Sequence, residues 1–145
     1  MDRKKAYRLI DANLNRAREG LRVIEDTLRF ILEDVRLCRK TRSLRHRLTE
    51  LTLELYPGML EYRDSRADPG RTLKEGGRKD IPSLLAANFR RAEEALRVLE
   101  EYSKVMSPGL SPGFKSVRYG VYTCEKAVLK LGTAGRCHAR KRSKR

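Results

Sequence analysis

Two sets of three polar residues in this sequence have types and spacing that suit the binding of an anion. Each set contains an asparagine, an arginine and a glutamate at three-residue spacing. A guanidinium binds phosphate oxygens through paired hydrogen bonds, and this spacing keeps side chains close together along a helix. The pattern therefore indicates a polar helical edge that occurs twice. The sets are Asn13, Arg16 and Glu19, and Asn88, Arg91 and Glu94.

Both sets belong to an internal repeat. Residues 11–29 align without gaps with residues 86–104, and nine of the 19 positions are identical, where average composition would give about one. Five of these nine positions are polar, whereas a duplication kept only for packing would preserve apolar positions first. The repeat therefore suggests two related halves that build polar surface for a shared purpose.

The repeat extends weakly into a second segment of each half, where residues 44–46 match residues 117–119. Arg45 and Arg118 stand at equivalent places in this match. Two guanidinium groups are therefore expected to point toward the axis between the halves and to clamp a phosphate. His46 follows Arg45 and is either structural or part of the same binding site.

A structural interpretation stands beside each functional one. Asn13 and Asn88 would then be buried amides that set helix register, and the arginines and glutamates would be solvated pairs at helical spacing. The small residues at the same edge, Gly20 and Ala95, allow the close approach either of a partner helix or of a flat ligand. The duplication of the polar types favours function, and both interpretations stay open.

The segment between the halves, residues 57–79, is predicted to be a long loop because most of it lacks hydrophobic periodicity. Loops of this length in compact domains are usually functional or disordered. Arg63 is a candidate binding residue, and Asp64 and Asp68 are candidate Mg²⁺ ligands if the loop closes over phosphates. The alternative is a flexible, solvated loop. The sequence contains no Walker motif and no dinucleotide fingerprint.

Apolar residues at steps of three and four predict the elements that carry these groups. The second of these elements is expected to end at Pro57-Gly58. The fold class is therefore all-α, with duplicated helical hairpins forming a four-helix bundle with pseudo-twofold symmetry. The predicted helices cover residues 4–33, 37–56, 80–106 and 114–131.

The length of 145 residues suits one domain. This domain is expected over residues 1–131, with repeat halves at about 5–56 and 80–131. A basic and flexible tail is expected over residues 132–145, where the glycines at 132 and 135 release the chain from its last helix.

The composition also favours an anionic ligand. The formal net charge is +15, and six of the basic residues lie from residue 136 onward. Such a surface suits phosphorylated small molecules, nucleic acid or acidic lipid. Three cysteines without a CxxC motif predict reduced thiols in a cytoplasmic protein. No apolar run approaches the ~18 residues of a membrane span, so no membrane partner is expected.

Five blocks of the sequence, at residues 11–26, 44–46, 63–64, 87–102 and 118–119, carry a family resemblance. Together they resemble the all-helical hydroxymethylpyrimidine-phosphate kinase family of bacterial thiamine biosynthesis. The resemblance covers nearly the whole of the predicted folded part. That domain is often fused in front of thiamine-phosphate synthase, which makes such a synthase an expected partner of this chain.

The resemblance implies a phosphotransferase that uses ATP to convert 4-amino-5-hydroxymethyl-2-methylpyrimidine phosphate to the diphosphate. It also implies that the enzyme does not phosphorylate the free alcohol. The acceptor phosphate has a second pKa of about 6, so it is ionised at neutral pH and needs no strong base. The chemistry instead needs Arg, Lys and Mg²⁺ to bring two anions together.

With this reaction in view, each candidate residue has an expected role. The four repeated arginines would contact the transferring phosphates as catalytic residues. The asparagines would bind the aminopyrimidine edge, because an amide offers a donor beside an acceptor, and the glutamates would bind its amino group or Mg²⁺. His46 and Arg63 complete the substrate-binding set, and Asp64 and Asp68 form the metal set. The arginines are Arg16, Arg91, Arg45 and Arg118, the amides are Asn13 and Asn88, and the acids are Glu19 and Glu94.

Two other functions stay open. A nonenzymatic basic helical module would bind nucleic acid, with an affinity that falls steeply in salt. The mixed signs of the repeated residues argue against it, since Glu19 and Glu94 would repel a phosphate backbone. A regulatory domain would bind a phosphorylated pyrimidine without turning it over.

Overall fold

The computed structural model describes residues 2–74 and 76–142, with side chains described as far as residue 131. Every regular element in this described part is a helix, which confirms the predicted all-α class. The α-helices are α1 Arg3–Phe30, α2 Val35–Leu51, α3 Tyr56–Tyr62, α4 Ile81–Met106 and α5 Ser111–Arg142. The short 3-10 helices η1, η2 and η3 lie at Leu53–Leu55, Pro69–Thr72 and Pro108–Leu110.

Aspartate caps begin three of the long helices, and Asp2 caps α1 by accepting the Lys4 N–H at 3.0 Å. The Leu37 backbone N–H donates to Asp34 Oδ1 at 2.8 Å at the start of α2. Asp80 and Ser83 form a reciprocal capping box at the start of α4, with the Ser83 N–H 2.8 Å from Asp80 Oδ1. These bonds satisfy backbone donors that a helix start leaves unpaired.

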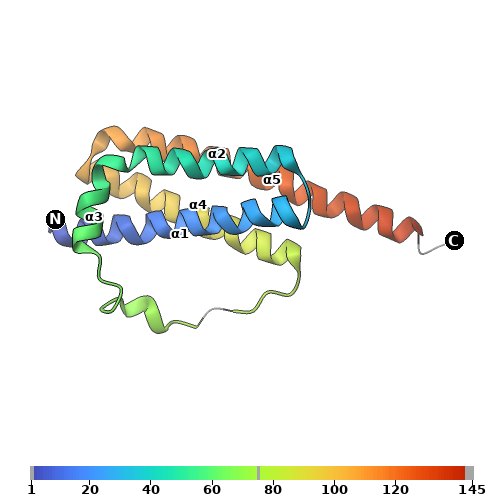
Figure 1. The fold of residues 1–145 in the computed structure, drawn as a ribbon, viewed down its shortest axis with the longest axis horizontal. Coiled ribbons are helices and arrows are strands. Elements are labelled where there is room, and N and C mark those ends of the chain that lie inside the picture. The colour runs from blue at the N-terminus through green and yellow to red at the C-terminus, as the bar shows by residue number, and fades with distance from the viewer. Residues whose placement is uncertain (1, 75, 143–145) are drawn as a thin grey trace.

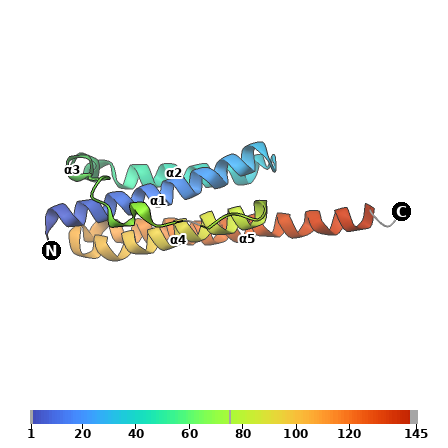
Figure 2. The ribbon, with the colours of Figure 1, turned by 90° about the horizontal axis from the view of Figure 1, so that it is seen from below.

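The four long helices lie side by side around one apolar core (Figure 1). Helix α1 packs against α2 and α4, and α5 packs against α4 and α2. In Figure 2, α1 and α2 form one layer and α4 and α5 form the other. A pseudo-twofold relation between these layers stays a prediction. The apolar stripe predicted for α1 is buried in this core through Ile10, Leu14, Ala17, Leu21, Ile24 and Leu28.

Helices α1 and α4 approach each other closely at Gly20. A Cβ atom at this position would lie 2.9 Å from the backbone oxygen of Asn88 and 3.6 Å from the Ala92 Cβ. The shorter of these distances is too small for a carbon against a carbonyl oxygen, so a larger residue would push the helices apart. Gly20 therefore admits the partner helix, which is one of the two predicted uses of a small residue at this edge.

The connection between the halves is more structured than predicted. Helix α2 ends at Leu51 rather than at residue 56, and Pro57 lies in the first turn of α3 instead of ending a helix. Proline is tolerated there because its missing N–H is one that a helix start leaves unpaired. A Cβ at Gly58 would lie 2.6 Å from the Tyr7 ring, so this glycine lets α3 pack on α1.

The ends of two other helices also differ from the predicted ones. Helix α1 ends at Phe30, before Glu33 adopts a left-handed φ of 53° in the turn to α2. Helix α5 continues to Arg142, past the glycines at which the chain was expected to leave it, and extends beyond the α1–α2 turn (Figure 1). Residues 143–145 of the predicted tail lie outside the described part. None of the described helices is long and apolar enough to cross a membrane.

Candidate functional site

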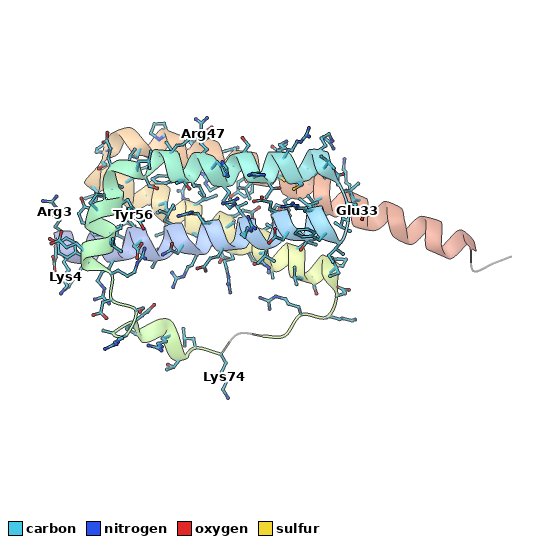
Figure 3. The ribbon with its side chains drawn as sticks, viewed as in Figure 1. Arg3, Lys4, Glu33, Arg47, Tyr56 and Lys74 are labelled. Carbon is cyan, nitrogen blue, oxygen red and sulfur yellow. The ribbon has the colours of Figure 1, made fainter. Side chains whose placement is uncertain are left out.

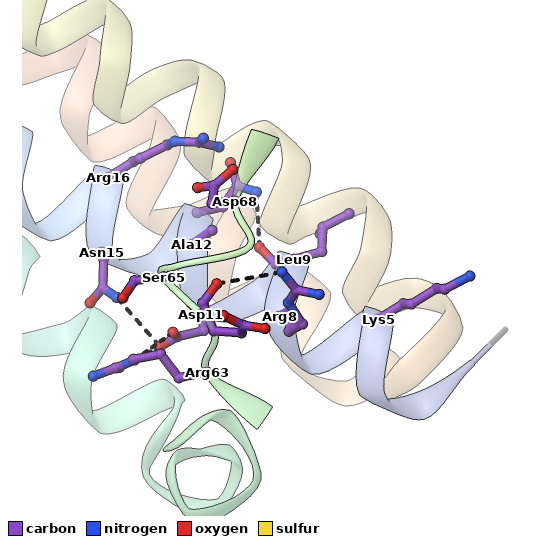
Figure 4. A pocket seen from close by; sticks show the side chains of 12 residues that line it. Lys5, Arg8, Leu9, Asp11, Ala12, Asn15, Arg16, Arg63, Ser65 and Asp68 are labelled. Carbon is purple, nitrogen blue, oxygen red and sulfur yellow. Dashed lines mark hydrogen bonds and ion pairs between the residues drawn. The ribbon is translucent and has the colours of Figure 1, made fainter. Parts of the chain in front are cut away.

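Two neighbouring cavities line the side of α1 that faces the loop. The first, of about 550 Å³, lies between α1 and the start of the loop (Figure 4). The second, of about 600 Å³, lies between α1 and α4. Asn13 and Arg16 line both cavities, and Arg91 and Glu94 line the second. The structure therefore brings four of the six repeated polar residues to one place.

Arginines dominate the second cavity. Arg16 faces it from α1, Arg90 and Arg91 face it from α4, and Arg78 reaches it from the loop. Glu94 contributes a carboxylate to the same lining. Four guanidinium groups around one carboxylate give the cavity a positive potential, which attracts and concentrates anions.

The two repeated asparagines have different surroundings although each bonds to its own helix. Asn13 Nδ2 donates to the Leu9 carbonyl and Asn88 Nδ2 to the Leu84 carbonyl, both at 2.9 Å. Each amide keeps a second N–H and its carbonyl oxygen for another partner. Asn13 lines both cavities. Asn88 lines neither of them and lies at the tight contact with Gly20.

An ion pair ties the start of the loop to α1. Arg63 donates to both oxygens of Asp11, from Nη2 at 2.6 Å and from Nε at 2.7 Å (Figure 4). This hydrogen bond raises the pKa of Arg63. Arg63 was predicted to bind substrate, which stays a prediction, and the structure shows that it holds the loop through the buried carboxylate of Asp11. The repeat gave no signal for Asp11, because its aligned partner is Ala86.

The two candidate metal ligands, Asp64 and Asp68, line the first cavity. An oxygen of each accepts a backbone N–H, from Ala67 at 3.0 Å and from Gly70 at 2.8 Å. The Ala67 bond, followed by the charge of Arg8, lowers the pKa of Asp64. No group of three or more His, Cys, Asp or Glu residues that could hold a metal occurs in the described part of the chain. Mg²⁺ commonly uses one or two carboxylates together with substrate phosphates, and this pair of aspartates fits that arrangement.

The other two candidate arginines lie apart from both cavities. Arg45 Nε donates to Glu25 at 2.8 Å, and Arg118 Nη2 donates to Glu100 at 2.7 Å. Both glutamates are buried, and a buried carboxylate needs a paired cation. The side chains of Arg45 and Arg118 therefore bind these two buried acids. The expectation was different: both guanidinium groups were to point toward the axis between the halves and clamp one phosphate. The repeat could have indicated this pairing, because Glu25 and Glu100 are identical residues at aligned positions of the two halves.

Glu19 and His46 also lie away from the two cavities. Glu19 lines a smaller cavity between α1 and α2 together with Arg45. His46 is exposed on α2 and lines none of these three cavities. Equivalent positions of the repeat therefore have unequal surroundings, since Glu94 shares its cavity with Arg16.

Comparison with known proteins gives relatives for most of the chain. The ThiD2 family matches residues 8–127. A relative called thiamine-phosphate synthase, from Nostoc punctiforme (strain ATCC 29133 / PCC 73102), is 46% identical over 126 residues, which are 85% of this chain and 35% of the relative. Another of that name, from Synechococcus sp. (strain CC9605), is 44% identical over 140 residues, which are 94% of this chain and 38% of the relative. The chain thus spans little more than a third of these relatives, and no solved structure matches it.

Proposed function

The chain belongs to the ThiD2 family, and from this premise we propose that it is a phosphotransferase of thiamine biosynthesis. Its reaction is the transfer of the γ-phosphoryl group of ATP to 4-amino-5-hydroxymethyl-2-methylpyrimidine phosphate, which gives the diphosphate. The observation that carries the proposal is the meeting of Arg16 and Arg91, from two different helices, in one cavity beside Asn13. The name shared by the relatives, thiamine-phosphate synthase, supports the pathway.

The site suits phosphoryl transfer between two anions. The acceptor phosphate has a second pKa of about 6, so an ionised oxygen attacks the γ-phosphorus without a general base. One P–O bond forms, the bond between the γ-phosphorus and the β-phosphate oxygen breaks, ADP leaves, and no proton is transferred. Arg16 of α1 and Arg91 of α4 stabilise the phosphates, and Arg78 and Arg90 add positive charge.

The same cavity offers groups for the pyrimidine ring. Asn13 binds the aminopyrimidine edge with its second N–H and its carbonyl oxygen, and Glu94 accepts a hydrogen bond from the amino group. In this proposal the site needs the acceptor phosphate for orientation, so the free alcohol is expected not to be a substrate. Part of this proposal is that Arg16 and Arg91 are equivalent groups of two hairpins related by a pseudo-twofold axis in a four-helix bundle.

A magnesium ion bound with ATP would supply positive charge at the β- and γ-phosphates. Asp64 and Asp68 would hold it, because both line the first cavity next to Arg16. The Arg63–Asp11 ion pair positions the segment that carries these two aspartates.

The proposed partner is a thiamine-phosphate synthase, and the proposed location is the cytoplasm. Relatives of that name contain a segment similar to this chain within a longer polypeptide. Proximity to a synthase would let the diphosphate pass to the next step of the pathway without dilution.

The direct test incubates the purified protein with ATP, Mg²⁺ and the pyrimidine monophosphate, and detects ADP and the diphosphate by mass spectrometry. Turnover is expected with the monophosphate and not with the free alcohol. The absence of both products from a sample with the expected helical circular dichroism would exclude the kinase. Saturable binding of the monophosphate without turnover would favour a regulatory domain, and salt-sensitive DNA binding without turnover would favour a nucleic-acid module.

A further inference from the structure

Arg45 and Arg118, the two arginines that pair with buried glutamates, differ in how many of their donors the protein uses. Arg118 donates from Nε and Nη2 to Glu100 at 2.9 and 2.7 Å, and from Nη1 to the Tyr122 hydroxyl at 3.0 Å. The rings of Tyr119 and Tyr122 lie 5.2 and 5.5 Å from its guanidinium carbon. Two aromatic rings and one carboxylate therefore cover this guanidinium.

Arg45 also pairs with a buried glutamate but is not covered in this way. Its Nε donates to Glu25 at 2.8 Å, and its two Nη groups have no hydrogen-bond partner among the described residues. The side chain is 15% exposed, so solvent or a ligand can still reach these donors. This difference between Arg45 and Arg118 arises one turn further along α2 and α5. There, Thr49 occupies the position equivalent to Tyr122. The shorter threonine side chain cannot reach across the guanidinium.

The uncovered Arg45 faces a cavity of about 280 Å³ between α1 and α2. Arg18 of α1 also lines this cavity, and its side chain makes no ion pair to a described residue. The position equivalent to Arg18 in the second half is Glu93. The first half therefore has two guanidinium groups with available donors where the second half has an acid and a covered arginine.

Three acidic groups at or beside this cavity limit what it can bind, and one of them, Glu25, already pairs with Arg45 at 2.8 Å. Glu19 lines the cavity but is exposed, so solvent screens its charge more than that of half-buried Arg18. Arg22 lines it too, and its Nε is bound to Asp26 at 3.1 Å. The groups left for a ligand are thus Arg18 and the outer face of Arg45.

We propose that this cavity between α1 and α2 is a second anion site, which binds a phosphoryl group through Arg18 and the Nη groups of Arg45. A planar guanidinium presents parallel N–H groups that match two phosphate oxygens, and a half-buried donor without a partner gains most from such a ligand. The ligand class is inorganic phosphate or the terminal phosphate of a small ester. The site belongs to the first half and shares no lining residue with the cavity of Arg16 and Arg91, so it does not depend on the proposed transfer reaction.

The test titrates inorganic phosphate into the ¹⁵N-labelled full chain and follows the Nε–H signals of Arg18 and Arg45 by NMR. Sodium chloride at matched ionic strength is the control for general screening. Saturable shifts of both signals are expected with phosphate only. The variant Thr49→Tyr places a tyrosine beside Arg45, at the position equivalent to that of Tyr122 beside Arg118. It should weaken phosphate binding about tenfold, because the phosphate loses one charge-assisted contact with Arg45.

Two further variants keep the test independent of how well a tyrosine fits at position 49. Arg18→Ala should also weaken phosphate binding about tenfold, whereas Thr123→Tyr, on the exposed side of α5, should leave it unchanged. Arg16→Ala should lower the proposed turnover at least ~100-fold but leave the Arg45 shift intact, which separates this site from the transfer site. The proposal is overturned if phosphate gives no saturable shift at Arg45, or if the wild type, Thr49→Tyr and Arg18→Ala bind it equally.

Discussion

Arg16 and Arg118 both belong to the repeated polar residues, yet the fold uses them in opposite ways. Arg16 is exposed and lines two cavities. Arg118 is 8% exposed, and Glu100 and Tyr122 accept its hydrogen bonds. An exposed guanidinium can exchange water for a ligand phosphate, whereas a buried one is held by the acid that it neutralises. The repeat therefore contains both arginines that can bind a ligand and arginines that neutralise a buried acid. The burial of the side chain tells the two kinds apart.

The largest expected effect is the loss of the buried arginine. Arg118→Ala leaves the buried Glu100 with only the long 3.5 Å contact to exposed Arg97, so the free energy of unfolding should fall by about 3–5 kcal/mol in urea titrations. The double variant Arg118→Met with Glu100→Leu should recover most of this loss, because an apolar pair needs no counter-charge. A loss below about 1 kcal/mol for Arg118→Ala would mean that this pair behaves like a surface pair.

The complementary change is made at the cavity. Arg16→Ala should lower turnover at least ~100-fold if this group stabilises the transferring phosphate, with a free energy of unfolding within about 0.5 kcal/mol of the wild type. The matched control is Arg47→Ala, because Arg47 is also exposed but lies on α2, across the molecule from the loop that carries Lys74 (Figure 3). Near-normal turnover of Arg16→Ala would make this arginine an ordinary surface residue.

A pH-dependent difference between the halves is expected at Glu93. Burial, followed by the charge of Glu125, raises the pKa of Glu93 from 4.5 to about 7. Because the folded state holds this proton more tightly, the stabilisation that it gives is complete below about pH 4.5 and is lost as the pH rises through about 7. Glu93→Gln should therefore be more stable than the wild type at pH 8, by about 1 kcal/mol after solvent screening.

Thermal unfolding at several pH values measures this difference, which should shrink toward pH 5. Glu54→Gln, at an exposed position, is the control and should show no such trend. A constant difference between Glu93→Gln and the wild type from pH 5 to pH 8 would contradict the raised pKa.

The smallest expected effect is at the ion pair that holds the loop. The Arg63 side chain is 39% exposed, so Arg63→Ala should cost about 1 kcal/mol or less of unfolding free energy. The effect should appear locally, as faster hydrogen exchange over residues 63–72 and a raised KM. Arg63→Lys should be intermediate, because lysine cannot make the paired contact with Asp11. Unchanged exchange in this segment would show that other contacts hold it.

Local sequence determined the helices and the faces that they bury. The apolar stripe of α1 and the caps Asp34 and Asp80 act within a few residues, so their effects were predictable from spacing alone. The repeat also led to the expectation that Arg16 and Arg91 share a site, and both line one cavity. These inferences needed no knowledge of how the helices face one another.

Tertiary structure alone decided which repeated polar groups meet an acid, a neighbouring helix or solvent. Glu25 of α1 accepts a hydrogen bond from Arg45 of α2. Whether the two side chains meet depends on the rotation and register of α1 against α2. Pro57 starts a helix because α3 can pack on α1. The physical reason is that periodicity sets which side chains share one face, whereas the free energy of a polar group depends on what the facing element presents to it.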